Sequence, residues 1–175
     1  MDTEEFKIRI LPLKNNLFRF ALRLMRNREE AEDVVQEVML KIWSMRFDLR
    51  KYESVEALMM TITRNQCLDR LKMKKNKAVS LVFDVGENVD DNPYRYSERR
   101  DMVKTVMNIV DRLPEQQRTI IQLRDVEAYS FEEMTEITGF DQNYIRVNLS
   151  RARKKIRETI EKLQKNELQQ HKGTS

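Results

Sequence analysis

The positively charged side chains close to the C-terminal end have the types and the spacing that bind nucleic acid. One short segment carries Arg146, Arg151, Arg153, Lys154 and Lys155. An arginine can donate two hydrogen bonds to a guanine edge, and both residue types bind phosphate. The segment therefore predicts a DNA-binding surface.

Local signals place these cations on the second helix of a helix-turn-helix. Ser130 is typical of a helix N-cap, and Glu133 follows it at the spacing of a capping box. Gly139 stands where the first helix must end in a left-handed residue, and Asp141 can cap the next helix. A short helix, a glycine turn and a cationic helix present side chains to the major groove of DNA.

The chain lacks the residue combinations that enzymes and metal sites use. It has one histidine, one cysteine and three glycines, which leave no nucleophile–base pair, metal ligand set or glycine-rich phosphate loop. We therefore expect no catalytic residue, metal, cofactor or small-molecule substrate. The cysteine, Cys67, cannot form an intramolecular disulfide, and its place in an apolar helix favours inert burial over a redox switch.

The composition predicts an all-α protein. Only three glycines and three prolines occur in 175 residues, and helix-forming residue types dominate. The formal net charge is +4, so the placement of the charges matters more than their sum. The N-terminus lacks a signal-peptide pattern, and no apolar run is long enough to span a bilayer. We expect a cytoplasmic protein without membrane insertion.

The pattern of apolar residues predicts two small helical domains joined by a flexible linker. Apolar side chains recur at helical spacing on either side of a stretch that instead collects glycine, proline and acidic residues. We place the first domain at residues 1–78, the linker at 79–98 and the helix-turn-helix domain at 99–165. Residues 166–175 are expected to form a disordered tail.

A second basic segment, from Arg64 to Lys77, lies in the first domain. It overlaps a helix expected from about Ser54 to Lys72, which is apolar on several sides and should therefore pack between neighbours. Two separated basic segments indicate two contacts with a polyanion.

One helix of the first domain carries a polar face that a partner protein could bind. From Arg28 onward, Asp33, Gln36 and Glu37 gather on the side opposite a stripe of Ala31, Val35, Val38 and Ile42. Such a cluster suits a basic partner helix. An ordinary solvated face explains the same pattern.

With both halves in view, the chain resembles a bacterial RNA polymerase sigma factor of the extracytoplasmic-function (ECF) group. The segments LFRFALRLMRNREEAEDVVQEVMLKIW and ITRNQCLDRLK are similar to the family's region 2. The segments LPEQQRTIIQLRDVEAYSFEEMTEITGF and YIRVNLSRARKKIRE are similar to its region 4. The order of the two motifs is more specific than either motif alone.

The resemblance implies a promoter-specificity subunit without enzymatic activity. Asp33, Gln36 and Glu37 match the face that docks on the clamp coiled coil of the largest subunit of core RNA polymerase. Region 4 is expected to contact the flap of the polymerase β subunit. Members of the family are commonly held inactive by an anti-sigma factor, which implies such a partner here as well.

The resemblance also implies where promoter DNA binds. For the −10 element, the matching positions are Tyr52, Glu53, Ser54, Val55, Arg64, Asn65 and Lys72. Capture of a flipped base needs a pocket, a stacking surface and cations. Alternatively, Asn65 caps or bridges helices and the lysine is merely solvated. Many relatives have a tryptophan where this chain has Leu58.

For the −35 element, the expected contacts lie opposite a buried stripe of Ile145, Leu149, Ala152 and Ile156. They are Asn143, Tyr144, Arg146, Val147, Ser150, Arg151 and Lys154. Val147 stands where relatives often carry a polar residue, so a base-specific hydrogen bond is in doubt there. A plain solvated basic face is the simpler alternative.

A conventional transcriptional regulator is the competing interpretation. Such a protein shares the helix-turn-helix but binds closed duplex DNA without polymerase, usually as a dimer on paired half-sites. The cluster of Asp33, Gln36 and Glu37 and the basic segment after Asn65 argue against it. Palindromic duplex binding by the isolated protein would favour it.

Overall fold

A computed structural model describes residues 1–80 and 98–172, and these residues form helices and turns without a strand. The N-terminal half contains α1 (Thr3–Arg9), η1 (Leu11–Leu13), α2 (Lys14–Met25), α3 (Arg28–Ser44), η2 (Leu49–Lys51) and α4 (Val55–Ser80). The C-terminal half contains α5 (Glu98–Asp111), α6 (Glu115–Ile121), a π-helical turn η3 (Gln122–Val126), α7 (Phe131–Thr138) and α8 (Gln142–Lys172). The prediction of an all-α fold in two parts is confirmed.

The boundary between α2 and α3 follows from two residues. Arg26 adopts a left-handed conformation at φ 54°, which ends α2. The side chain of Asn27 then accepts a hydrogen bond from the Glu30 backbone N–H at 3.0 Å and caps α3. Buried apolar residues of the two helices face each other, among them Phe20, Leu24, Val34 and Val38.

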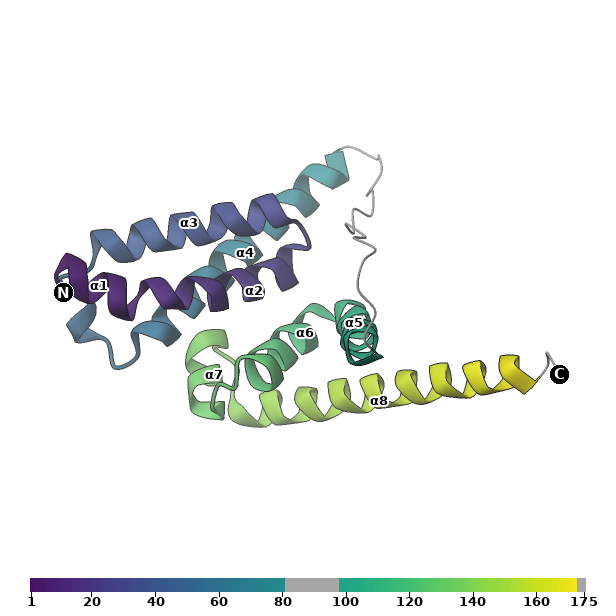
Figure 1. Ribbon diagram of the computed structural model, residues 1–175. Coiled ribbons are helices and arrows are strands. Elements are labelled where there is room, and N and C mark those ends of the chain that lie inside the picture. Colours follow the sequence, from purple (N-terminus) through teal and green to yellow (C-terminus); the bar gives the residue numbers. More distant parts are fainter. Residues whose placement is uncertain (81–97, 173–175) are drawn as a thin grey trace.

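Helix α4 is buried on several sides, as its sequence predicts. It packs against α2 and α3 of its own half and against α7 of the other half. Ala57, Met59, Met60, Thr63 and Cys67 are all fully buried. Figure 1 shows the resulting arrangement, in which α7 lies against the first turns of α4 and α8 extends away from both.

The helix-turn-helix forms as its local signals predict. Ser130 Oγ accepts from the Glu133 N–H at 3.2 Å, and a Glu133 carboxylate oxygen accepts from the Ser130 N–H at 2.8 Å. Gly139 ends α7 at φ 72°. Asp141 Oδ1 accepts from the Tyr144 N–H at 2.8 Å and caps α8. Two hydrogen-bonded caps therefore fix where the two helices begin.

The structure changes two of the expected boundaries. Helix α8 continues to Lys172, although a disordered tail was expected from residue 166; residues 166–172 contain no glycine or proline that would stop a helix. The expected linker at 79–98 overlaps the end of α4 and the first residue of α5, and its residues 81–97 lie outside the described part of the chain. None of the described helices is both long and apolar enough to cross a membrane.

We predict that Cys67 is unreactive in the folded protein. Its side chain is fully buried, and burial raises its pKa to about 12, so the thiol stays protonated at neutral pH. Relative to its ordinary pKa, the thiolate fraction falls about a thousandfold. Titration with a thiol reagent should therefore proceed only after denaturant is added. Rapid labelling of the native protein would contradict this burial.

We predict that Gly139→Ala destabilises the protein by about 1 kcal/mol. A Cβ at this position meets no atom within 4 Å, so the cost comes from the left-handed backbone alone. Ala128 allows the reverse substitution, because its backbone is left-handed at φ 62° although the residue carries a Cβ atom. Ala128→Gly should stabilise by a similar amount, and urea unfolding of both variants measures the pair. Equal effects of the two substitutions in the same direction would contradict the backbone argument.

Candidate nucleic-acid interface

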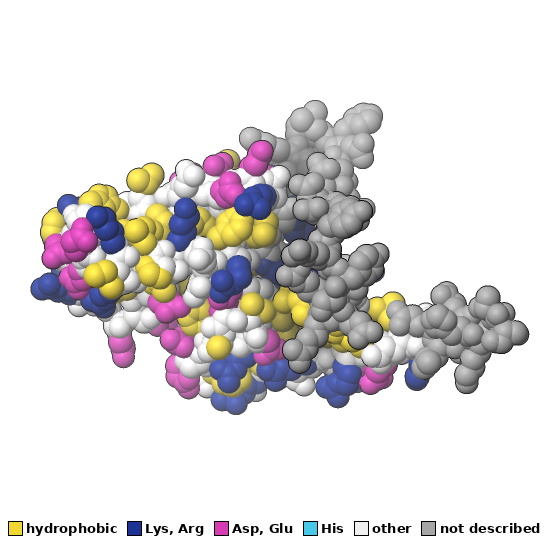
Figure 2. Space-filling view, viewed as in Figure 1, with side chains coloured by type: hydrophobic (Ala, Val, Ile, Leu, Met, Phe, Trp, Pro, Cys, Tyr) yellow, Lys and Arg dark blue, Asp and Glu magenta, His cyan; other side chains and the backbone are white. Residues whose placement is uncertain are grey.

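Helix α8 presents one face to the core and the opposite face to solvent. Ile145, Leu149 and Ala152 are buried against the rest of the C-terminal half. The expected DNA contacts on the opposite face are exposed: Asn143, Val147, Ser150, Arg151 and Lys154. Figure 2 shows Lys and Arg side chains following α8 along the lower edge of the molecule. The structure therefore places these five residues together on an accessible surface.

The flanks of this surface are held by contacts within the C-terminal half. The Tyr144 hydroxyl donates to Gln116 Oε1 at 3.1 Å. The Arg146 guanidinium lies 4.2 Å from the centre of the Phe131 ring, at the start of α7. Arg153 donates two hydrogen bonds to Asp125, which raise the pKa of Arg153. Arg153 is thus partly neutralised, whereas Arg151 is exposed and has no ion-pair partner among the described residues.

The polar face of α3 is equally accessible. Asp33, Gln36 and Glu37 are all exposed and lie opposite the buried Val35 and Val38. The Glu37 carboxylate accepts a hydrogen bond from Arg70 Nη2 at 2.6 Å, an ion pair that ties α3 to α4. Glu37 therefore already has a cationic partner, and Asp33 and Gln36 have none among the described residues.

Of the four residues from Tyr52 to Val55, at the start of α4, two have exposed side chains and two contribute to the fold. Tyr52 is 43% exposed and Glu53 is exposed, so both are accessible to a ligand. Ser54 Oγ accepts from the Ala57 N–H at 3.1 Å, so this hydroxyl caps α4. Val55 is half-buried and packs against the core. Tyr52 and Glu53 are therefore the two exposed side chains of this segment, and Ser54 and Val55 are half-buried.

Along α4, the structure separates two expected −10 contacts that are neighbours in sequence. Asn65 and Lys72 are exposed and lie two turns apart on one side of the helix. Arg64 is turned toward the C-terminal half, and its guanidinium lies 5.4 Å from the Phe140 ring. Its Nε is buried without a hydrogen-bond partner, and burial lowers the pKa of Arg64. Arg64 does not share the surface of Asn65 and Lys72.

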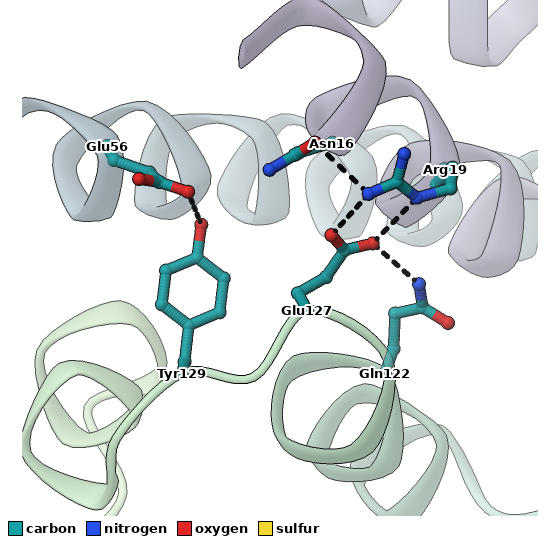
Figure 3. A network of polar contacts seen from close by, with 6 residues as sticks. All are labelled: Asn16, Arg19, Glu56, Gln122, Glu127 and Tyr129. Carbon is teal, nitrogen blue, oxygen red and sulfur yellow. Dashed lines mark hydrogen bonds and ion pairs between the residues drawn. The ribbon is translucent and has the colours of Figure 1, made fainter.

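A polar network connects the two halves beside this site, as Figure 3 shows. Arg19 of α2 donates to both carboxylate oxygens of Glu127, at 3.1 and 2.7 Å, and also to Asn16. Gln122 donates to the same carboxylate at 3.1 Å. The side chain of Glu127 is only 1% exposed, and its hydrogen bond raises the pKa of Arg19.

Two further contacts cross between the halves. The Tyr129 hydroxyl donates to a Glu56 carboxylate oxygen at 3.0 Å, and burial together with Glu56 raises the pKa of Tyr129. Arg23 donates to Asp111 at 2.6 Å. Sequence reasoning missed these pairs because the partners lie 73 and 88 residues apart, and no local spacing connects them.

Comparison with known proteins matches both halves to one family. The family model described as Sigma-70 region 2 matches residues 10–77. The model described as Sigma-70, region 4 matches residues 104–156. The polar face of α3 falls within the first match, and the helix-turn-helix falls within the second.

Relatives and solved structures agree with this match. The RNA polymerase sigma factor SigV of Bacillus subtilis is 30% identical over 146 residues, covering 82% of this chain and 84% of that protein. ECF RNA polymerase sigma factor SigM of Mycobacterium tuberculosis is 27% identical over 80% of this chain and 69% of its own length.

The fold is shared with a sigma factor, RpoE, from a complex with the anti-sigma factor NepR from Bartonella quintana. The TM-score is 0.79 at 24% identity, covering 91% of this chain and 98% of that one. CnrH, solved with the cytosolic domain of CnrY, has a TM-score of 0.63 at 17% identity, covering 91% of this chain and 90% of that one. This chain belongs to the ECF group of the sigma-70 family, whose members are promoter-specificity subunits of RNA polymerase and have no enzymatic activity of their own.

Proposed function

We propose that this sigma factor uses three separate surfaces to direct transcription initiation. Asp33, Gln36 and Glu37 bind the clamp coiled coil of core RNA polymerase. The residues before and along α4 bind the opened −10 element, and α8 reads the −35 element. The observation that carries the proposal is that the polar face of α3 and the basic face of α8 are exposed at the same time, on different halves.

The −35 surface combines base contacts with phosphate contacts. Arg151 has the exposure and the length to donate two hydrogen bonds to a guanine, and Arg146 reaches DNA from the flank of the same helix. Val147 is 38% exposed and offers an apolar contact for a thymine methyl group. Lys154, together with the neighbouring lysine, binds phosphates, which fix register without reading sequence.

The −10 surface is built for single-stranded DNA. The exposed ring of Tyr52 supplies a stacking surface, and the exposed Asn65 and Lys72 lie on one side of α4. Partly buried Leu58 packs against the core at the position where many relatives carry tryptophan. Base support in this chain therefore comes from Tyr52 and not from a ring on α4.

Region 4 also offers an apolar groove of about 420 Å³ between α5, α6 and α8. Val110, Ile121, Ile156 and Ile160 line it. An apolar groove of this kind fits one helix of a partner, and we assign it to the flap of the polymerase β subunit.

We further propose that an anti-sigma factor regulates this chain in the cytoplasm. Two proteins that share its fold, RpoE and CnrH, were solved with NepR and with the cytosolic domain of CnrY. The exposed faces of α3 and α8 are the surfaces that such a partner must cover to prevent both polymerase and DNA binding.

We predict that Asp33→Arg and Gln36→Ala each weaken binding to core polymerase by about tenfold or more. Charge reversal places a cation against basic partner residues, and the alanine removes an amide from the same face. Fluorescence anisotropy with labelled core enzyme measures the change. Glu4→Arg is the control, because it reverses an exposed charge on α1 and not on the helix that carries this face. Unchanged core affinity in both variants would rule out this interface.

We predict that Arg151→Ala lowers transcription by about tenfold on promoters with an intact −35 element, since one bidentate base contact contributes about 1–3 kcal/mol. Reconstituted transcription from pooled genomic promoter fragments first supplies the promoters. Lys162→Ala is the control, an exposed cation further along α8. An equal loss on templates lacking the −35 element would show that Arg151 does not read it.

A further inference from the structure

A cationic pocket lies on one flank of α8, where the middle of that helix meets the start of α7. Its volume is about 340 Å³. The residues that line it are Phe131, Arg146, Leu149, Ser150, Arg153 and Arg157. Phe131 and Leu149 supply an apolar lining, and the three arginines supply positive charge. The composition of the pocket therefore suits an anion.

The polar residues of this pocket form one stripe along α8. Arg146, Ser150, Arg153 and Arg157 follow one another at intervals of four, three and four residues, so they lie on the same side of the helix. All four are exposed. Arg151, by contrast, lies about 100° around the helix from Ser150. The stripe is therefore a separate edge beside the face that is proposed to read bases.

The fold uses only part of the hydrogen-bonding capacity of this stripe. The Arg157 guanidinium and the Ser150 hydroxyl make no hydrogen bond or ion pair with any described residue. Arg146 donates to Gln142 Oε1 at 3.4 Å, and its guanidinium lies 4.2 Å from the centre of the Phe131 ring. Guanidinium and hydroxyl groups both donate to phosphate oxygens, so one phosphate can accept from several of these groups at once.

We propose that this pocket binds one backbone phosphate of the −35 duplex. The inference rests on the proposed function, in which Val147 and Arg151 contact bases from the same helix. Lys154 offers a point charge on an open surface, whereas a pocket with several donors sets the position of the phosphate that it holds. That contact fixes the register of α8 on the duplex without reading sequence.

Asp125, in the turn η3, limits the affinity of the pocket. Its carboxylate accepts two hydrogen bonds from Arg153, at 3.0 and 2.5 Å. A bidentate contact with phosphate requires the same donors, so Arg153 exchanges one anion for another when DNA binds. Arg157 has no such partner and supplies the larger share of the affinity. Because Asp125 weakens a contact that every duplex offers, binding depends more strongly on the base contacts.

The test uses holoenzyme assembled from core polymerase and the full chain. Its binding is measured over a range of salt concentrations on labelled duplexes of about 20 base pairs, one with the −35 element and one with that element scrambled. Arg157→Ala should weaken binding to both by about tenfold and reduce the slope of log affinity against log salt by about 0.9. Arg157→Lys should keep the slope, because it keeps the charge. Asp125→Asn should tighten binding to both duplexes and steepen the slope.

Two controls accompany these variants. Lys162→Ala removes an exposed cation of α8 that lines neither this pocket nor the groove assigned to the flap, so its effect should be small. Arg157 and Asp125 also line that groove, so the affinity of each variant for core polymerase is measured separately and the holoenzyme is formed at saturating core.

A second experiment locates the bound phosphate. In a series of −35 duplexes, one phosphate at a time is replaced by a neutral methylphosphonate. Replacement at one position should weaken wild-type binding by about tenfold. Arg157→Ala should lose no further affinity at that position, because two changes that remove the same contact are not additive. Arg151→Ala should show the full loss there.

Titration calorimetry with inorganic pyrophosphate tests a free phosphate compound as the alternative source of the anion. We expect no saturable binding at micromolar concentrations. Saturable binding that Arg157→Ala abolishes would overturn the assignment to DNA. An unchanged salt slope in Arg157→Ala, or the lack of any methylphosphonate position to which that variant is insensitive, would overturn it as well.

The same measurements separate this inference from the proposed function. If Arg157→Ala has no effect while Arg151→Ala still lowers the preference for the −35 element, the phosphate pocket alone is rejected. If wild-type holoenzyme binds the −35 and scrambled duplexes equally, the −35 assignment of α8 fails, and the pocket proposal fails with it.

Discussion

The apolar character of α4 on several sides is the constraint on which the rest of the structure depends. A helix with one apolar stripe needs one neighbour, whereas α4 buries Ala57, Met59, Met60 and Cys67 and needs several. Helices α2 and α3 cover two of its sides, and α7 covers a third. One apolar side of α4 is therefore left uncovered by the N-terminal half, and α7 of the C-terminal half packs against it.

Polar contacts determine how that cover is oriented. Burial of apolar surface is non-directional, so it does not by itself fix how α7 lies on α4. The two oxygens of Glu127 are held by Arg19 and Gln122, and Tyr129 meets Glu56 across the contact. Removing one partner would leave a buried charge or donor unpaired, which is costly. The apolar surface supplies attraction, and the hydrogen bonds select one geometry.

The features that the sequence predicts correctly are those determined by residues only a few positions apart. The capping pair Ser130 and Glu133, the left-handed Gly139 and the exposed face of α8 all follow from spacings of a few residues. The two partners of Arg19 and Tyr129 could not be found in this way, because they lie on the other half of the chain. Helical spacing also placed the polar face of α3 and the basic face of α8, and the resemblance supplied the roles of polymerase and DNA binding that we propose for them.

Arg64 and Asn65 show the limit of such reasoning most clearly. They are adjacent in sequence, yet one turns toward region 4 and the other toward solvent, since successive residues of a helix point about 100° apart. Family similarity assigns both to one DNA surface, and the packing of the halves shows which of the two is covered. The Arg64 guanidinium lies beside the Phe140 ring and its Nε is buried without a hydrogen-bond partner, so the contact between the halves decides what this side chain can reach.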